Sequence, residues 1–268
     1  MSDLQKPITI ATGWHWFRAG FVRYRRNPVL MVFWMMSYWT MLGLVGLVPV
    51  VGDLLVAALA PALLVGVMAG CRALDAETMP SFTLLFSGFG SRLQPLMGLG
   101  VLHFVLTLGV LGLTALFDGG VLLQLMARST LGATTNTTPP DLAAVTLTPL
   151  IVAMLAYAPI MMAFAYAPLL VAWRGFGVGK ALFFSLVGSW RAWQGLLGLL
   201  LTILFFGVIV AALLMMLLMV LGVSDAVATS LVVVPLMAVL APTVLSALLS
   251  SYSDILPDTE GASSAQPL

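Results

Sequence analysis

The chain has 268 residues, of which 61% are hydrophobic and only 8% are charged, and its mean hydropathy is +1.11. A soluble domain carries roughly 25% charged residues to cover its surface. The composition therefore excludes a soluble globular protein and predicts a chain surrounded by lipid. Eleven Lys and Arg residues against ten Asp and Glu residues also leave no basic excess for nucleic-acid binding.

Six apolar runs are each long enough to cross the roughly 30 Å of bilayer hydrocarbon as a helix. They cover residues 28–51, 54–71, 95–117, 147–173, 195–222 and 226–250. The start of the chain lacks the short apolar core and cleavage site of a signal peptide, so we expect it to remain in the mature protein. The sequence thus predicts an all-α, polytopic transmembrane helix bundle with six spans.

The distribution of basic residues predicts the orientation of this bundle. Six spans place both termini on one side, and cytoplasmic loops carry the excess of Lys and Arg. Arg128 is the one basic residue of the eleven that falls on the opposite side from the termini. We therefore predict that both termini are cytoplasmic and that residues 118–146 form the longest outer connection.

A threefold internal repeat organises the spans. The segments FRAGFVRYRRNP, FTLLFSGFGSRLQP and ALFFSLVGSWRAWQG precede the first, third and fifth spans, and each combines Phe, small residues and an Arg. The second, fourth and sixth spans each contain an Ala-Pro pair, with the proline at Pro61, Pro168 or Pro242. The predicted unit is a cytoplasmic amphipathic helix in the membrane plane, an outward helix, and an inward helix kinked at proline.

These repeats predict the domain organisation. One transmembrane domain covers residues 12–252 and consists of repeats 12–72, 80–175 and 180–252. Residues 1–11 form an N-terminal cytoplasmic tail. Residues 253–268 lack apolar periodicity and are expected to form a disordered cytoplasmic tail.

The segment before the first span, GWHWFRAGFVRYRRNP, concentrates aromatic and basic residues. Its rings recur at three- and four-residue spacing, which is typical of a helix lying among lipid headgroups. Each basic residue near an anionic leaflet adds about 1 kcal/mol of attraction. The candidate lipid-binding or partner-binding residues are Trp14, Trp16, Arg18, Arg23, Arg25 and Arg26. The alternative is a helix that only anchors the topology.

The same segment also carries a resemblance, together with LVPVVGDLLVAALAPALLVGVMAGCRAL, FAYAPLL, KALFFSLVGSWRAW and SSYSDIL. These stretches resemble a family of uncharacterised six-span proteobacterial inner-membrane proteins. The resemblance covers nearly the whole chain, to about Leu256. More loosely, the plan is similar to the membrane domain of some glycerophosphodiester phosphodiesterases, without their soluble catalytic domain. The resemblance implies that the protein is located in a bacterial inner membrane, and it identifies no functional residues.

Residues that could support chemistry are sparse inside the spans. His103 is the one titratable side chain well inside a predicted span, and it is a candidate intramembrane polar site. It could relay protons or act as a ligand, or it could make one structural hydrogen bond to a threonine hydroxyl or a carbonyl of a neighbouring helix. The pair Met31 and Met35 shares a helix face, but no His or Cys pattern joins it, so we predict no metal and no cofactor. Gly66 and Gly70 permit close helix contact, which we expect within the chain.

The sequence therefore favours a protein without catalytic activity. We expect a membrane-organising or assembly role, in which membrane lipids, a membrane-protein partner or a second copy of the chain bind the basic aromatic segment. The alternative is a transporter or channel for a neutral or amphipathic small molecule. Proline-interrupted spans suit that alternative, because their freed carbonyls can line a path.

Overall fold

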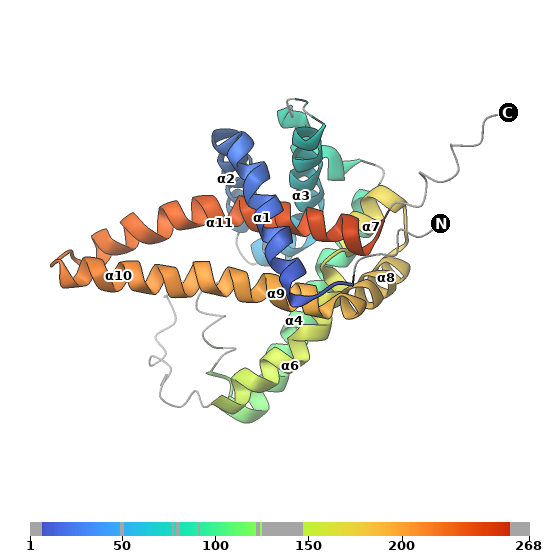
Figure 1. The fold of residues 1–268 in the computed structure, drawn as a ribbon. Helices are drawn as coiled ribbons and strands as arrows, with labels where there is room; N and C mark the ends of the chain where they lie inside the picture. Colours follow the sequence, from blue (N-terminus) through green and yellow to red (C-terminus); the bar gives the residue numbers. More distant parts are fainter. Residues whose placement is uncertain are drawn as a thin grey trace. The chain divides into compact units, whose positions relative to one another are not determined.

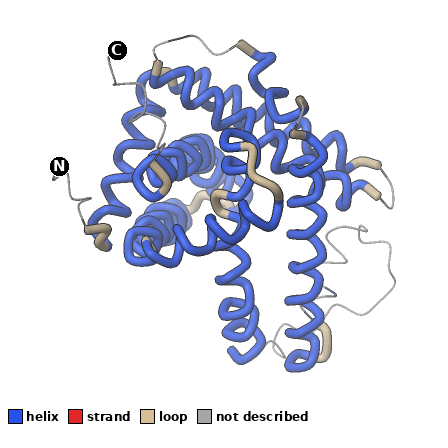
Figure 2. The backbone as a smooth tube through the Cα atoms, turned by 90° about the vertical axis from the view of Figure 1, so that its right-hand side faces the viewer, coloured by secondary structure: helices blue, strands red, loops and turns tan. Residues whose placement is uncertain are grey.

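The computed structural model describes residues 7–48, 51–76, 78, 81–90, 92–121, 124 and 147–257. Across these residues the regular structure is helical, with no strand (Figure 2). Six helical segments are long and apolar enough to cross a membrane, which confirms the predicted all-α polytopic bundle. They are Pro28–Gly46, Gly52–Asp75, Leu93–Asp118, Leu147–Arg174, Trp193–Val220 and Asp225–Ile255.

In chain order the elements can be grouped into the three predicted repeats (Figure 1). The first repeat contains α1 (Ile10–Arg26), α2 (Pro28–Gly46) and α3 (Gly52–Asp75). The second contains η1 (Phe82–Phe89), α4 (Leu93–Asp118), α6 (Leu147–Phe164) and α7 (Ala167–Arg174). The third contains α8 (Val178–Arg191), α9 (Trp193–Leu204), η3 (Phe205–Val210), α10 (Ala211–Val220) and α11 (Asp225–Ile255). Each repeat thus opens with a short helix, and the in-plane position of these short helices stays a prediction.

The repeated prolines act differently in the three repeats. Pro61 lies inside α3 and Pro242 inside α11, whereas Pro168 follows a break between α6 and α7. At this break the hydroxyl of Ser185 accepts a hydrogen bond from the backbone N–H of Tyr166 at 3.0 Å. The same hydroxyl donates to the carbonyl of Met162 at 2.9 Å. Ser185 therefore takes the place of one helical hydrogen bond, which is how a helix tolerates such an interruption within a bundle.

The chain divides into two compact units. Unit 1 comprises Met1–Ser37, Val67–Leu84 and Gly188–Leu268, and unit 2 comprises Tyr38–Gly66 and Leu85–Val187. Within unit 1, α1 lies across α9 and α11, and α10 packs beside α11 (Figure 1). Within unit 2, α4 packs against α6 and α7.

Glycines bring the backbone of α1 into direct contact with its neighbours in unit 1. A Cβ atom added at Gly13 would overlap the backbone of α9, and one added at Gly20 would overlap the carbonyl of Thr243 and the backbone of Ala247. The buried cluster at this crossing includes Trp16, Phe17, Leu199, Leu240 and Ala247. The short helix α1 is thus a packed part of unit 1.

Unit 2 contains a similar contact between η1 and α3. A Cβ atom at Gly88 would overlap the carbonyl of Ala62, and one at Gly66 would overlap the carbonyl of Leu85. In unit 1, a Cβ atom at Gly70 would meet the indole ring of Trp34. Both Gly66 and Gly70 therefore serve contacts within the chain, as the sequence predicted.

Several predicted features lie outside the described residues. They include Lys6, Arg128, most of the 118–146 connection and residues 258–268 of the expected C-terminal tail. Helix α1 begins at Ile10, inside the stretch 1–11 that the sequence assigned to a tail. Helix α11 continues past residue 252 to Ile255.

Candidate lipid-binding site

Local sequence defines where α1 begins and ends. Thr9 caps its first turn, and the backbone N–H of Thr9 donates to the Thr12 hydroxyl at 3.0 Å. After Arg26, Asn27 leaves the helical conformation, and its side-chain oxygen accepts from the backbone N–H of Leu30 at 3.2 Å. Pro28 then suits the first position of α2, because it has no N–H to satisfy there. Three arginines consequently gather in the last turn of α1.

The six candidate residues divide into two groups. Trp14, Arg18, Arg25 and Arg26 are exposed, whereas Trp16 and Arg23 turn toward the rest of unit 1. Trp16 is only 2% exposed, and its indole N–H donates to the carboxylate of Asp254 at 2.6 Å. Trp16 and Arg23 therefore hold α1 in place, which differs from the surface position that the spacing pattern alone had suggested.

Arg23 connects α1 to two other helices. Its Nε and Nη2 donate to the two carboxylate oxygens of Asp75 at 2.8 and 2.7 Å. Its Nη1 donates to the carbonyl of Ser246 at 2.8 Å and to the Ser250 hydroxyl at 3.4 Å. The Arg23 side chain is 11% exposed, and Asp75 is 42% exposed. A bidentate pair shielded on the arginine side fixes geometry more firmly than an open surface pair.

The exposed residues of α1 present aromatic rings beside positive charge. Trp14 stacks on Phe17, with ring centroids 6.0 Å apart, and on Phe206, at 6.3 Å. Phe17 and Phe206 stack at 5.4 Å. Phe206 belongs to η3, a π-helical turn inside the fifth span. Such turns often occur at functional sites, because they displace side chains from the regular helical positions.

Arg18 and Arg25 differ from the other arginines of α1 in their ion pairing within the part of the chain that the structure describes. Arg26 lies 3.8 Å from a carboxylate oxygen of Asp75, and Arg23 bonds the same carboxylate. Among the described residues, neither Arg18 nor Arg25 has an acidic partner. Both guanidinium groups are therefore available to an external anion, and their planar fork suits a phosphate.

An apolar groove of about 460 Å³ runs along this side of α1. We call it the α1–α11 groove. Its α1 side is formed by residues that recur at helical spacing: Trp14, Phe17, Arg18, Phe21, Val22 and Arg25. Its opposite side is formed by Phe206, Leu236, Val239 and Leu240. The groove thus combines two arginines that have no acidic partner among the described residues with a lining that is otherwise aliphatic and aromatic.

A second groove lies on the other side of Trp14. It has a volume of about 420 Å³, and Trp14 and Phe206 line it together with Ile10 and Leu201. The sequence did not predict Phe206 at either groove, nor the α11 residues of the α1–α11 groove, because they are ordinary apolar residues within spans. The adjacent Phe205 and Phe206 carried no signal that distinguishes them from packing.

His103 lies on α4 in unit 2. Its Nε2 is 3.0 Å from the hydroxyl of Tyr157 on α6, and its ring contacts Phe164 edge-on at 5.0 Å. The structure therefore gives His103 one interhelical hydrogen bond, to a tyrosine rather than to the threonine or carbonyl that the sequence suggested. Within the described residues, no three His, Cys, Asp or Glu side chains gather as metal ligands.

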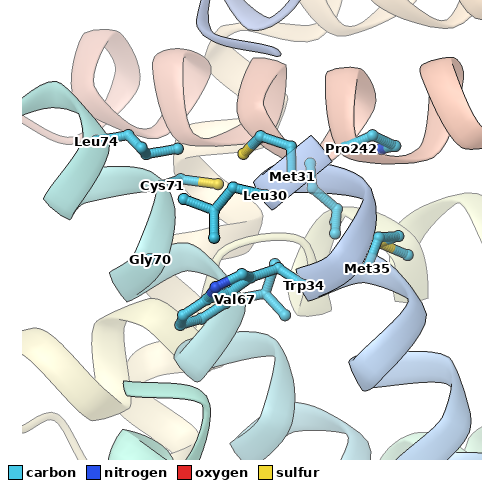
Figure 3. Close-up of a pocket in the computed structure, with 10 residues that line it drawn as sticks. Leu30, Met31, Trp34, Met35, Val67, Gly70, Cys71, Leu74 and Pro242 are labelled. Carbon is cyan, nitrogen blue, oxygen red and sulfur yellow. The ribbon is translucent and has the colours of Figure 1, made fainter. Parts of the chain in front are cut away.

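A small pocket in unit 1 brings together residues of α2, α3 and α11 (Figure 3). Its volume is about 10 Å³, which is room for about one water molecule. Met31, Met35 and Cys71 line it with Trp34, among other apolar residues. The Cys71 thiol lies 3.6 Å from the Ser246 hydroxyl, at the helix crossing that Arg23 also contacts. The pocket is an apolar packing gap between three helices.

Comparison with known proteins identifies the family. A probable inner membrane protein of Burkholderia thailandensis is 37% identical over 191 residues, which cover 69% of each chain. The chain belongs to this family of inner-membrane proteins. With its six membrane-capable helices, it is an integral protein of the bacterial inner membrane. No protein-family model and no solved structure matches it. The looser similarity to glycerophosphodiester phosphodiesterases receives no support from these comparisons.

Proposed function

We propose that this inner-membrane protein is a non-catalytic, membrane-organising protein that binds anionic lipid of the cytoplasmic leaflet through α1. The observation that carries the proposal is the pair Arg18 and Arg25, which are exposed and have no acidic partner among the described residues. Unpaired basic residues next to a membrane attract anionic lipid by about 1 kcal/mol each.

The orientation is part of this proposal. The excess of Lys and Arg on the side of the termini supports a position of α1 at the cytoplasmic leaflet. A reporter domain fused after Leu268 should therefore be active in the cytoplasm. A cysteine at Thr135, in the outer connection beyond the described residues, should react with a reagent that does not cross the membrane. Reaction of Thr135→Cys only after the cells are broken would contradict the orientation.

The test of lipid binding uses the full chain extracted from native membranes together with its surrounding lipid. Mass spectrometry should find phosphatidylglycerol-type lipid enriched over bulk membrane, with less enrichment as salt rises, because salt screens charges near the surface. Lipid at bulk composition would contradict the proposal. A stoichiometric protein that copurifies with the chain, without lipid enrichment, would instead favour a partner-binding role.

Transport of a neutral or amphipathic small molecule remains the competing hypothesis from the sequence. Its support is the interrupted fourth span, where the α6 to α7 break is held by Ser185. Uptake measured in vesicles that contain the purified chain would favour it, whereas lipid enrichment without uptake favours the membrane-organising role.

A further inference from the structure

We propose that the α1–α11 groove is a binding site for one anionic phospholipid, whose acyl chain lies in the groove and whose phosphate bonds Arg18 and Arg25. This inference rests on the proposed function and assigns it to a particular site. All residues that line the groove belong to unit 1.

The lining fits an acyl chain. Apart from the two arginines, the groove walls are aromatic and aliphatic, including Phe21 and Val22 on α1 and Val239 on α11. Its volume of about 460 Å³ lies within the ~300–1,000 Å³ range of small-molecule sites. Because the α11 side of the groove belongs to a membrane-spanning helix, hydrocarbon chains are its natural neighbours.

The charges fit a phosphate next to that chain. Arg18 and Arg25 are seven residues apart, so they lie on one face of α1 at about 10 Å along the helix axis. A lipid anion between them can reach one or both guanidinium groups, which bind phosphate oxygens in a bidentate fashion. An acidic peptide would satisfy the arginines but would leave the apolar walls without a matching partner. A lipid satisfies both parts of the groove.

The fixed position of α1 makes this a formed site. Gly13 and Gly20 allow backbone contact with α9 and α11, and Arg23 bonds Asp75 and Ser246. These contacts hold Trp14, Arg18 and Arg25 along one side of the groove before a ligand arrives. A preformed site loses less conformational entropy on binding than a mobile segment does.

The test measures lipid retained by the full chain in detergent, by native mass spectrometry. The protein is titrated with phosphatidylglycerol and phosphatidylcholine of identical acyl chains. Wild type should bind phosphatidylglycerol preferentially. The Arg18→Gln/Arg25→Gln variant should bind it about thirtyfold more weakly, because two attractive charges are lost.

A matched control variant distinguishes lipid binding in the groove from general electrostatic attraction of anionic lipid to the protein. Lys180→Gln/Arg191→Gln removes the same net charge at exposed basic residues outside α1 that do not line the groove. It should bind phosphatidylglycerol as wild type does. An equal loss in both double variants would overturn the groove site while leaving anionic-lipid binding intact. No preference for phosphatidylglycerol in wild type would overturn both proposals.

Two further arms test the acyl chain. Val22 is 48% exposed, so Val22→Trp should fold normally while filling the groove, and it should lower the binding of both lipids. Unchanged binding by Val22→Trp would place the lipid elsewhere. Glycerophosphoglycerol, the headgroup without chains, should not displace the lipid at equal concentration. Displacement by this headgroup would show a phosphate site without a chain site and would overturn the proposal.

Discussion

The short helices α1 and η1 open the first and second repeats, and they dock in the same way but carry different surfaces. In unit 1, Gly20 of α1 meets the carbonyl of Thr243, the residue after Pro242. In unit 2, Gly88 of η1 meets the carbonyl of Ala62, the residue after Pro61. The docking contact therefore recurs in two of the three predicted repeats, whatever else the short helix carries.

What differs is the chemistry displayed around that contact. The sequence of η1, FTLLFSGF, contains no charged residue, whereas α1 has arginines throughout its second half. A contact that recurs in both units is explained by packing. The exposed arginines and Trp14 of α1 are not needed for a contact that η1 makes without them. The side chains of α1 that packing does not explain therefore lie on its exposed side.

The largest expected effect comes from breaking the shared contact. Gly20→Ala and Gly88→Ala should each destabilise the protein by about 3 kcal/mol, because the new methyl group meets backbone atoms that cannot move aside as a side chain could. The measurement is the apparent unfolding temperature in detergent. Gly109→Ala in α4 is the control, since an added Cβ there meets nothing within 4 Å.

The control should leave stability unchanged or raise it slightly, because alanine is the better helix former. If Gly20→Ala were as stable as Gly109→Ala, the close approach of α1 to α11 would be contradicted. If only one of the two docking glycines were sensitive, the docking would not be common to both repeats.

The second prediction concerns the arginines within α1. Arg23→Gln should cost about 2 kcal/mol of stability, since it removes charge-assisted hydrogen bonds to Asp75 and Ser246. Arg25→Gln should change stability by less than about 0.5 kcal/mol, as is usual for an exposed residue. The same thermal measurement tests both. Equal losses would mean that the position of Arg25 is also fixed by packing, which would weaken its assignment to lipid.

The sequence predicted the six spans well because an apolar run is a local signal. Apolar runs, basic loops and the recurring Ala-Pro pairs can each be read within a few residues. The sequence could not predict that Arg23 makes structural bonds while Arg25 stays exposed. This difference depends on Asp75 and Ser246, which are distant from α1 in the sequence. A charge pattern gives the composition of a helix face, and only the packed fold shows which charges already have partners.

The α1–α11 groove was beyond sequence reasoning for the same reason. The wall opposite α1 is formed by residues of η3 and α11. Leu236 on this wall is more than two hundred residues away from Trp14 in the sequence. Those wall residues are apolar residues in apolar spans, so their type says only that they face lipid or protein. The arginine half of the site was visible in the sequence, and the hydrocarbon half was not.

The last prediction concerns the hydrogen-bonded pair His103 and Tyr157 in unit 2, whose expected contribution to stability is smaller than that of Arg23 in unit 1. His103 shares one hydrogen bond with Tyr157, at 3.0 Å. Interhelical hydrogen bonds in membranes average about 0.6 kcal/mol, because the partners find substitutes when separated. His103→Gln and Tyr157→Phe should each lower stability by about 1 kcal/mol or less, with yield and assembly retained. The double variant should lose less than the sum of the two, since both changes remove the same bond. Strict additivity would show that the two side chains do not interact.

If His103→Gln instead abolished lipid enrichment or solute uptake while Tyr157→Phe did not, the histidine would have a role beyond this bond, and the functional surface would extend beyond α1.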